Sequence, residues 1–126
     1  MSYDPENVFA KILRGEIPNQ TVYEDDHVLA FNDIAPSAPV HVLVVPKGAY
    51  VTLDDFTAHA PEAAQAALMR AIGEVARLTG LAEDGFRVIS NNGGNGRQEV
   101  PHLHFHVVGG RRLGVFLPRD RDAGDA

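Results

Sequence analysis

The strongest constraint on the fold is an alternation of side chains near the end of the chain. In the run HLHFHVV, every second position is a histidine: His102, His104 and His106. Successive side chains of a β-strand point to opposite faces, and residues two apart on one face lie about 6.6 Å from each other. The pattern therefore predicts a strand over residues 100–108, with three imidazoles on one face and apolar side chains entering a core on the other.

Length and composition predict one folded domain. The chain has 126 residues, of which 44% are hydrophobic and 22% charged, as in ordinary globular domains. No repeat or Pro/Gly/Ser-rich linker divides it, and only residues 119–126 (RDRDAGDA) read as a polar tail, so we expect a single domain over residues 1–118. The absence of cysteine excludes disulfides, thiolate metal sites and a cysteine nucleophile.

The charge balance argues against a nucleic-acid partner. Eleven Lys and Arg residues face 17 Asp and Glu, for a net charge of −6, whereas sequence-independent binding to nucleic acid needs an excess of cations. No apolar run approaches the roughly 20 residues that span a bilayer, and the N-terminus lacks the basic start and apolar stretch of a signal peptide. We expect a cytoplasmic protein without a membrane partner, and small anionic ligands remain possible.

The remaining elements predict an α+β domain. Asp4 and Pro5 suggest the start of a short helix that Gly15 ends. Residues 21–24 and 27–32 suggest two strands joined at Asp25-Asp26, and residues 40–45 a third. Apolar positions three or four apart predict one long helix over residues 61–79, and a further strand follows over residues 86–90. Grouped strands with a helix between the groups predict an antiparallel five-stranded sheet with one short and one long helix.

Three imidazoles on one face indicate a functional site, because each buried imidazole must find partners for both ring nitrogens. One possible chemistry is a metal site, since three histidines leave an open coordination position. The other is covalent catalysis, in which a neutral imidazole attacks phosphorus or carbon. Three positions along one strand are nearly collinear and fit a tetrahedron poorly, which favours the nucleophile without excluding the metal.

Four segments resemble a known family. The segment HLHFHVVGGR resembles the histidine-triad (HIT) motif, and FAKILRGEIP, YEDDHVLAFNDIAP and HVLVVPK are similar to segments of the nucleotide-binding HINT branch. The match runs in order from about residue 7 to residue 112. It implies a HIT-like α+β fold and hydrolysis at the α-phosphate of a purine nucleotide or nucleoside phosphoramidate, with no cofactor and no metal. It also implies a homodimer built on the long helix and a sheet edge, with the alanine-rich surface of that helix at Ala63, Ala66, Ala67 and Arg70 in the interface.

The resemblance assigns roles to four histidines. His104, the central member, corresponds to the nucleophile that forms a transient nucleotidyl-histidine. His102 and His41 correspond to residues that support the tautomer and the proton relay. His106 corresponds to the residue near the phosphate and the leaving group.

The nucleotide contacts are also implied by the resemblance. Asp33 corresponds to the residue at the ribose hydroxyls, and Asn91 and Gln98 correspond to phosphate contacts. An apolar slot for the base corresponds to Phe9, Ile12, Phe31 and Ile34. Taken alone, the apolar residues are more typical of a core than of a binding slot, and Asp33 and the glycine-rich loop are typical of turns.

Two departures from the family pattern bear on mechanism. Glu99 stands where Ser or Thr commonly donates to the phosphate or leaving group, and an ionised carboxylate cannot donate. Asn7 and Ala10 stand where some bacterial relatives carry zinc-binding thiolates, so that zinc site is absent. Two alternatives to the hydrolase therefore stay open: a nucleotide-binding module with weak turnover, for which Glu99 is the main argument, and a histidine-ligated metal hydrolase.

Overall fold

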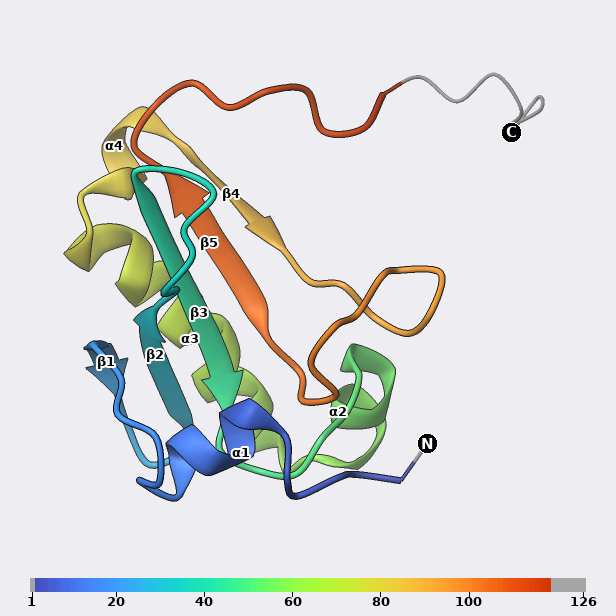
Figure 1. The fold of residues 1–126 in the computed structure, drawn as a ribbon. Coiled ribbons are helices and arrows are strands. Elements are labelled where there is room, and N and C mark those ends of the chain that lie inside the picture. The colour runs from blue at the N-terminus through green and yellow to red at the C-terminus, as the bar shows by residue number, and fades with distance from the viewer. Residues whose placement is uncertain (1, 119–126) are drawn as a thin grey trace.

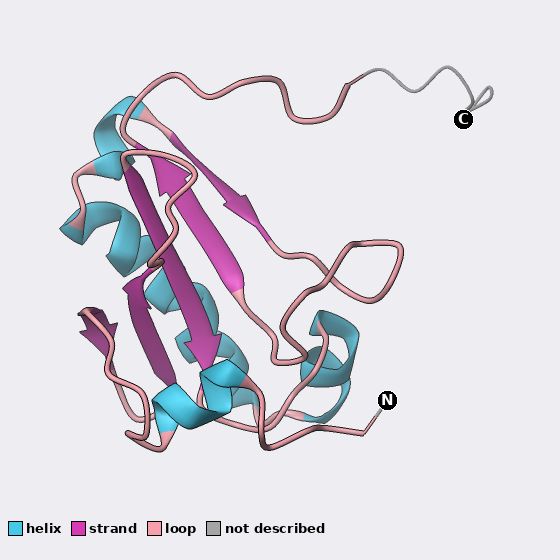
Figure 2. Cartoon of the chain, in the orientation of Figure 1, coloured by secondary structure: helices cyan, strands magenta, loops and turns pink. Residues whose placement is uncertain are grey.

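The computed structural model describes residues 2–118; the predicted tail, residues 119–126, lies outside them. Its centre is one five-stranded antiparallel sheet in the order β1-β2-β3-β5-β4 (Figures 1 and 2). The elements in chain order are α1 (Val8–Leu13), β1 (Thr21–Glu24), β2 (Val28–Asn32), β3 (Val40–Pro46), α2 (Leu53–His59), α3 (Glu62–Leu78), α4 (Leu81–Asp84), β4 (Phe86–Ile89) and β5 (Phe105–Gly109). The predicted antiparallel α+β fold is confirmed.

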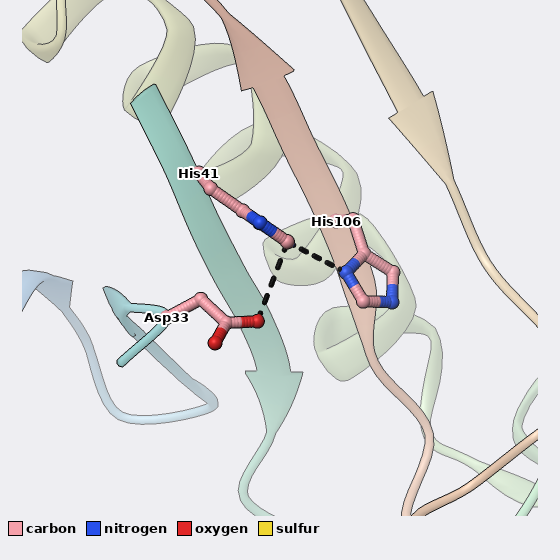
Figure 3. Close-up of side chains that lie close together, drawn as sticks. All are labelled: Asp33, His41 and His106. Carbon is pink, nitrogen blue, oxygen red and sulfur yellow. Dashed lines mark hydrogen bonds and ion pairs between the residues drawn. The ribbon is translucent and has the colours of Figure 1, made fainter. Parts of the chain in front are cut away.

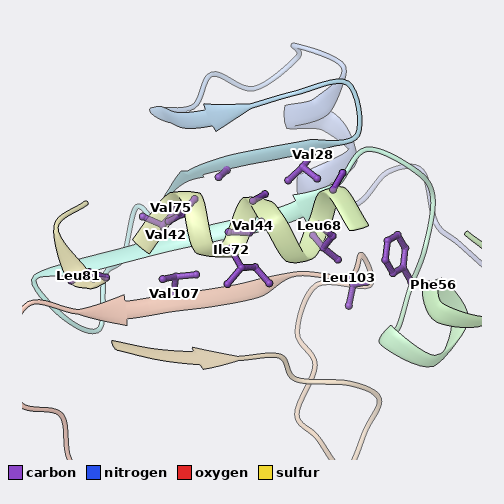
Figure 4. Packing of buried hydrophobic residues seen from close by; sticks show 13 residues of the cluster. Val28, Val42, Val44, Phe56, Leu68, Ile72, Val75, Leu81, Leu103 and Val107 are labelled. Atoms are coloured by element: carbon purple, nitrogen blue, oxygen red, sulfur yellow. The ribbon is translucent and has the colours of Figure 1, made fainter. Parts of the chain in front are cut away.

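The two faces of the sheet are covered unequally. The long helix α3 lies behind the sheet in Figure 1 and packs against alternate residues of the central strands (Figure 4), including Val42, Val44 and Val107, which are fully buried. The short helix α1 lies in front of the sheet at one end of the strands. Its Phe9 packs with a smaller cluster from β2 and β3: Leu29, Phe31, Leu43 and Val45. A six-residue helix leaves part of this front face uncovered, which makes room for a pocket.

Helix α1 begins later than the sequence predicts. Its N-cap is Asn7, whose side-chain oxygen accepts from the backbone N–H of Ala10 at 2.9 Å. Asp4 is not the cap: its carboxylate accepts from the backbone N–H of Glu6, and its carbonyl accepts from the Asn7 side-chain amide. The prediction was wrong because Asp4 forms a turn that precedes the helix. Gly15, with a φ of 81°, follows the helix end as expected.

The last strand is shorter than the alternation predicts. β5 begins at Phe105, because Pro101 has no N–H for a sheet ladder and the N–H of Leu103 donates instead to the carbonyl of Tyr50 at 2.8 Å. His102 and His104 therefore precede the strand, and the predicted row of three imidazoles along one strand was wrong. The short helices α2 and α4 were also missed. No helix in residues 2–118 combines the length and apolarity needed to cross a bilayer.

Candidate active site

A pocket of about 1090 Å³ opens on the α1 face of the sheet. Helix α1 and the segment after it form one wall, the end of β2 forms the floor, and the loop before β5 forms the opposite wall. The lining residues are Val8, Phe9, Ile12, Ile17, Pro18, Asn19, Gln20, Phe31, Asn32, Asp33, Ile34, Leu43, Asn91, Gly96, Arg97, Glu99, Val100, His104 and His106. Of the four histidines singled out from the sequence, two face the pocket and two lie behind them.

His104 is held as a single tautomer. Its Nδ1 lies 2.7 Å from the backbone carbonyl of His102, and because a carbonyl can only accept, Nδ1 must carry the proton. The lone pair is then on Nε2. Within the described residues, Nε2 forms no hydrogen bond. Every buried side-chain nitrogen or oxygen of these residues does have a hydrogen-bond partner, so Nε2 is not buried. Nε2 of His104 is therefore accessible from the pocket, with its lone pair free to attack.

His102 supports that tautomer with its backbone and not with its ring. The imidazole is fully buried and turned away from the pocket: Nε2 donates to the carbonyl of Pro46 at 2.8 Å, and Nδ1 accepts from the hydroxyl of Tyr3 at 2.5 Å. The ring thus anchors the backbone whose carbonyl orients His104. The expected role in proton relay is not supported, because both ring nitrogens are occupied by groups outside the pocket.

His41, His106 and Asp33 form the second group (Figure 3). The backbone N–H of Ser37 donates to Nδ1 of His41 at 3.0 Å, so the proton of neutral His41 is on Nε2. This atom lies 2.9 Å from Nδ1 of His106 and 3.4 Å from the Asp33 carboxylate. His106 accepts at Nδ1 and so carries its proton on Nε2. Like that of His104, this Nε2 forms no hydrogen bond with residues 2–118, and His106 lines the pocket.

Burial favours the uncharged form of three histidines, His102, His104 and His106. Burial lowers the pKa of His102 to about 4, although the hydrogen bond to the Pro46 carbonyl raises it. Burial also lowers the pKa of His106 to about 4, and the neighbouring His104 and His41 lower it further. Burial also lowers the pKa of His104, opposed by the hydrogen bond to the His102 carbonyl and by the negative charges of Asp33 and Glu99. At neutral pH, His104 and His106 are therefore both uncharged.

The buried His102 predicts acid sensitivity of the fold. Its folded pKa of about 4 lies below the ordinary value of 6.5, so the unfolded chain binds more protons between those pH values, and stability falls as pH decreases from 6.5 to about 4. At 1.36 kcal/mol per unit, the loss is on the order of 2 kcal/mol at pH 5. Urea unfolding at pH 7.5 and pH 5 measures it.

Two variants isolate this contribution of His102. His102→Gln is expected to reduce the difference in unfolding free energy between the two pH values, whereas substitution of the exposed His59 by Gln leaves it unchanged. Equal pH dependence in wild type and His102→Gln would assign the effect to other groups.

The predicted nucleotide contacts are distributed around the pocket. Phe9 and Phe31 meet edge to face, with ring centroids 5.7 Å apart, and Ile12 lies beside them in the lining. Ile34 lies at the rim and is fully exposed. The Asp33 carboxylate is partly exposed, lines the same pocket and lies 3.4 Å from Nε2 of His41. The lining therefore has an apolar compartment at Phe9, Ile12 and Phe31 and a polar one at Asp33 and the histidines.

The loop before β5 places the remaining candidates differently. Asn91 and Glu99 line the pocket, but Gln98 does not. Its side-chain oxygen accepts from the N–H of Gly93, and its amide donates to the carbonyls of Val51 and Val100. These bonds leave no side-chain group of Gln98 directed at a phosphate. Its expected role as a phosphate contact is therefore corrected: Gln98 holds the loop together.

Sequence reasoning missed both lining and positioning residues. The segment after α1, the last residue of β2 and the loop before β5 contribute further lining residues: Ile17, Pro18, Asn19, Gln20, Asn32, Gly96 and Arg97. Tyr3 and Ser37 position histidines from behind. None of these residues belongs to a periodic pattern, so the sequence alone carried no signal for them.

One group within the site could hold a metal ion. A ligand atom from each of Asp33, His41 and His106 lies within 4.8 Å of the other two. The group differs from the three histidines of the motif, and its atoms already bond with one another. The expectation of chemistry without a metal stays a prediction.

Comparisons with known proteins agree with this geometry. The sequence pattern of the HIT domain matches residues 14–113. The chain is 61% identical over 118 residues to an uncharacterized 13.2 kDa HIT-like protein of Azospirillum brasilense, covering 94% of this chain and 97% of that protein. It is 45% identical over 112 residues to the purine nucleoside phosphoramidase of Escherichia coli K12, covering 89% and 93%.

A solved structure gives the same result for the fold. The chain resembles a histidine triad protein from Clostridium difficile with a TM-score of 0.80 and 43% identity, covering 92% of this chain and all of that one.

Proposed function

The chain belongs to the HIT domain family and resembles its hydrolases, and from that premise we propose that it hydrolyses a purine nucleoside phosphoramidate, or a related α-phosphate substrate, through a covalent intermediate on His104. The observation that carries the proposal is the tautomer of His104. Its proton is tied to the His102 carbonyl and its free lone pair faces the pocket. A neutral imidazole oriented in this way is a nucleophile that needs no further deprotonation.

In the first step, Nε2 of His104 attacks the α-phosphorus and the bond from phosphorus to the leaving nitrogen breaks. The leaving nitrogen takes the proton from Nε2 of His106 and departs as a neutral amine. The ring of His104 becomes positively charged as its Nε2 bonds to phosphorus, and the negative charge of the nearby Asp33 carboxylate stabilises it. The deprotonated His106 is stabilised by the Nε2–H of His41, which donates to its Nδ1 across 2.9 Å. The proton on Nδ1 of His104 stays there throughout, donated in a hydrogen bond to the His102 carbonyl.

In the second step, water attacks the phosphorus of the nucleotidyl-histidine. The water proton passes to Nε2 of His106, which restores the starting tautomer, and the bond to Nε2 of His104 breaks. The products are a nucleoside monophosphate and free enzyme. The chemistry needs two neutral imidazoles side by side, and the rings of His104 and His106 have centroids 5.1 Å apart.

The pocket supports a purine nucleotide as the ligand. The apolar compartment offers edge-to-face aromatic rings for a base, and the Asp33 carboxylate can accept hydrogen bonds from ribose hydroxyls. The Escherichia coli relative named as a purine nucleoside phosphoramidase points to the same class of substrate.

The direct test is mass spectrometry of protein quenched rapidly after exposure to adenosine phosphoramidate in excess chelator. We expect an adenylyl adduct on His104, and turnover that chelation does not alter. Nucleotide binding without adduct or turnover would instead identify a binding module, an alternative kept open by the unusual Glu99. Activity lost with a stoichiometric metal would identify a metal hydrolase centred on Asp33, His41 and His106.

Glu99 is expected to influence the choice of leaving group. It lines the pocket, and its charge is one of two that raise the pKa of His104. A carboxylate there disfavours a phosphate leaving group and tolerates an amine. Glu99→Ser is expected to narrow the preference for phosphoramidates over dinucleoside polyphosphates about tenfold, or ~1.4 kcal/mol. It should also move the acidic limb of the rate profile to lower pH, because the pKa of His104 falls further.

The matched control for this prediction is Glu83→Ser, which removes an exposed carboxylate from α4. It is expected to change neither the leaving-group ratio nor the pH profile. An unchanged ratio in Glu99→Ser would mean that the carboxylate does not act on the leaving group.

We also propose that the protein is a cytoplasmic homodimer. The exposed surface of α3 includes Ala63, Ala66 and Arg70, and Met69 beside them is 72% exposed; β4 at the sheet edge exposes Phe86 and Val88. Ala67, which was expected at this interface, is instead buried against the protomer's own core. Sedimentation of a single 13.6 kDa species at micromolar concentration would refute the dimer.

A further inference from the structure

Arg97 has a backbone conformation that arginine rarely adopts. Its φ is 62°, and it is the one non-glycine residue with a positive φ among residues 2–118. In this left-handed region the Cβ of an L-residue crowds the following carbonyl, so glycine is favoured. A residue that keeps a side chain at such a position suggests a use for that side chain.

The surrounding loop enforces this conformation. The N–H of Arg97 donates to the carbonyl of Gly94, and Gln98 exchanges two hydrogen bonds with Gly93, at 3.1 and 2.9 Å. The Gln98 amide also donates to the carbonyl of Val51 at 2.7 Å. A Cβ at Gly96 would collide with the backbone of Asn92. Arg97 is therefore held in place by its neighbours and is not free to relax.

The anchored Gln98 determines where its neighbours lie. Its side chain points into the loop, and the flanking residues Arg97 and Glu99 both line the pocket. Arg97 is the one lysine or arginine among the described lining residues, and none of the ion pairs within residues 2–118 involves it. It is an exposed cation at the mouth of the site.

We propose that Arg97 forms an anion subsite for the leaving group and selects phosphoramidates whose departing amine carries a carboxylate, as an amino acid does. The proposal rests on the proposed function. The charges in the pocket limit the number of negative charges that the leaving group can carry. Asp33 and Glu99 oppose a leaving group with several negative charges, whereas a single carboxylate can pair with the Arg97 guanidinium by charge-assisted hydrogen bonds.

The test compares two substrates with the same phosphorus–nitrogen bond: adenosine 5′-phosphoramidate linked to glycine, and the same compound linked to glycinamide. The wild type is expected to show a kcat/KM about tenfold higher for the glycine conjugate, expressed mainly in KM. Arg97→Gln removes the charge and should bring the ratio close to one, whereas Arg97→Lys should retain part of it. Arg77→Gln on α3, across the sheet from the pocket, is the charge control and should keep the wild-type ratio.

Arg97→Gly separates substrate recognition from a structural role. It removes the side chain and restores the residue that the backbone conformation favours, so we expect the melting temperature to rise by a few degrees while the selectivity is lost. A structural role predicts the reverse: lower stability, and equal losses on both substrates. A wild-type ratio near one, or an unchanged ratio in Arg97→Gln, would overturn the proposal.

Failure of the proposed hydrolase activity can be distinguished from failure of the Arg97 subsite. If wild type hydrolyses neither conjugate, the proposed activity fails, and the affinities of the two conjugates for His104→Ala protein then test the subsite. A preference for the glycine conjugate that disappears in the His104→Ala, Arg97→Gln double variant supports the anion subsite. Equal affinities in both proteins contradict it.

Discussion

His104→Ala is expected to reduce turnover of adenosine phosphoramidate by about a thousandfold or more while nucleotide affinity changes only a few-fold. The reason is the single free lone pair that the geometry directs at the substrate. Nδ1 of His104 is bonded to the His102 carbonyl, and only Nε2 can form the bond to phosphorus. Steady-state kinetics and equilibrium binding of a nucleoside monophosphate measure the two quantities independently.

The control for this prediction is His59→Ala. His59 is an exposed histidine at the end of α2 whose Nδ1 contacts only Asp55, so its loss is expected to leave both quantities at wild-type values. Retention of a tenth of wild-type activity by His104→Ala would eliminate the covalent mechanism, since no other imidazole in the lining could replace the nucleophile without losing its own role.

His106→Ala is expected to slow hydrolysis of alkylamine phosphoramidates by about a hundredfold to ten-thousandfold, the usual contribution of a positioned general acid. The chain of protons from Ser37 through His41 places the transferable proton on Nε2 of His106. An amine leaves poorly without that proton, whereas a nitrophenolate leaves readily as an anion. The loss should therefore fall below about tenfold for the nitrophenyl ester of the same nucleotide.

The dependence on leaving group is what identifies the role of His106. Equal losses on the amine and nitrophenyl substrates would show that His106 binds the phosphate and does not protonate the leaving group. His27→Ala, at an exposed position immediately before β2, serves as a histidine control and should leave both rates unchanged.

Much of the fold was predictable because local patterns and tertiary contacts agree. The β-branched run at residues 40–45 became the central strand β3, buried on both faces, and the apolar spacing of residues 61–79 became α3, ending before Gly80 with its φ of 77°. Helix α2 was missed because it is short: of its seven residues only Phe56 is buried, so no apolar period marks it.

The candidate site was predictable in its chemistry more than in its geometry. The alternation at residues 102–106 identified the histidines, and the resemblance to the HIT family singled out His104. The alternation could not show that Pro101 interrupts the ladder or that the N–H of Leu103 bonds to Tyr50, some fifty residues earlier. That distant contact turns the ring of His102 away from the pocket and brings its carbonyl to His104.

The sequence by itself therefore determined the class of fold, the long helix, the order of the strands along the chain and the residue types available for catalysis, because side-chain periodicity and composition are local properties. Only the tertiary structure decided which nitrogen of each histidine carries its proton, that Gln98 holds a loop, and that Arg97 and Glu99 flank the pocket. These features depend on hydrogen-bond partners such as Tyr3, Ser37 and Val51, which lie far from the motif in the chain and meet it only after the sheet has formed.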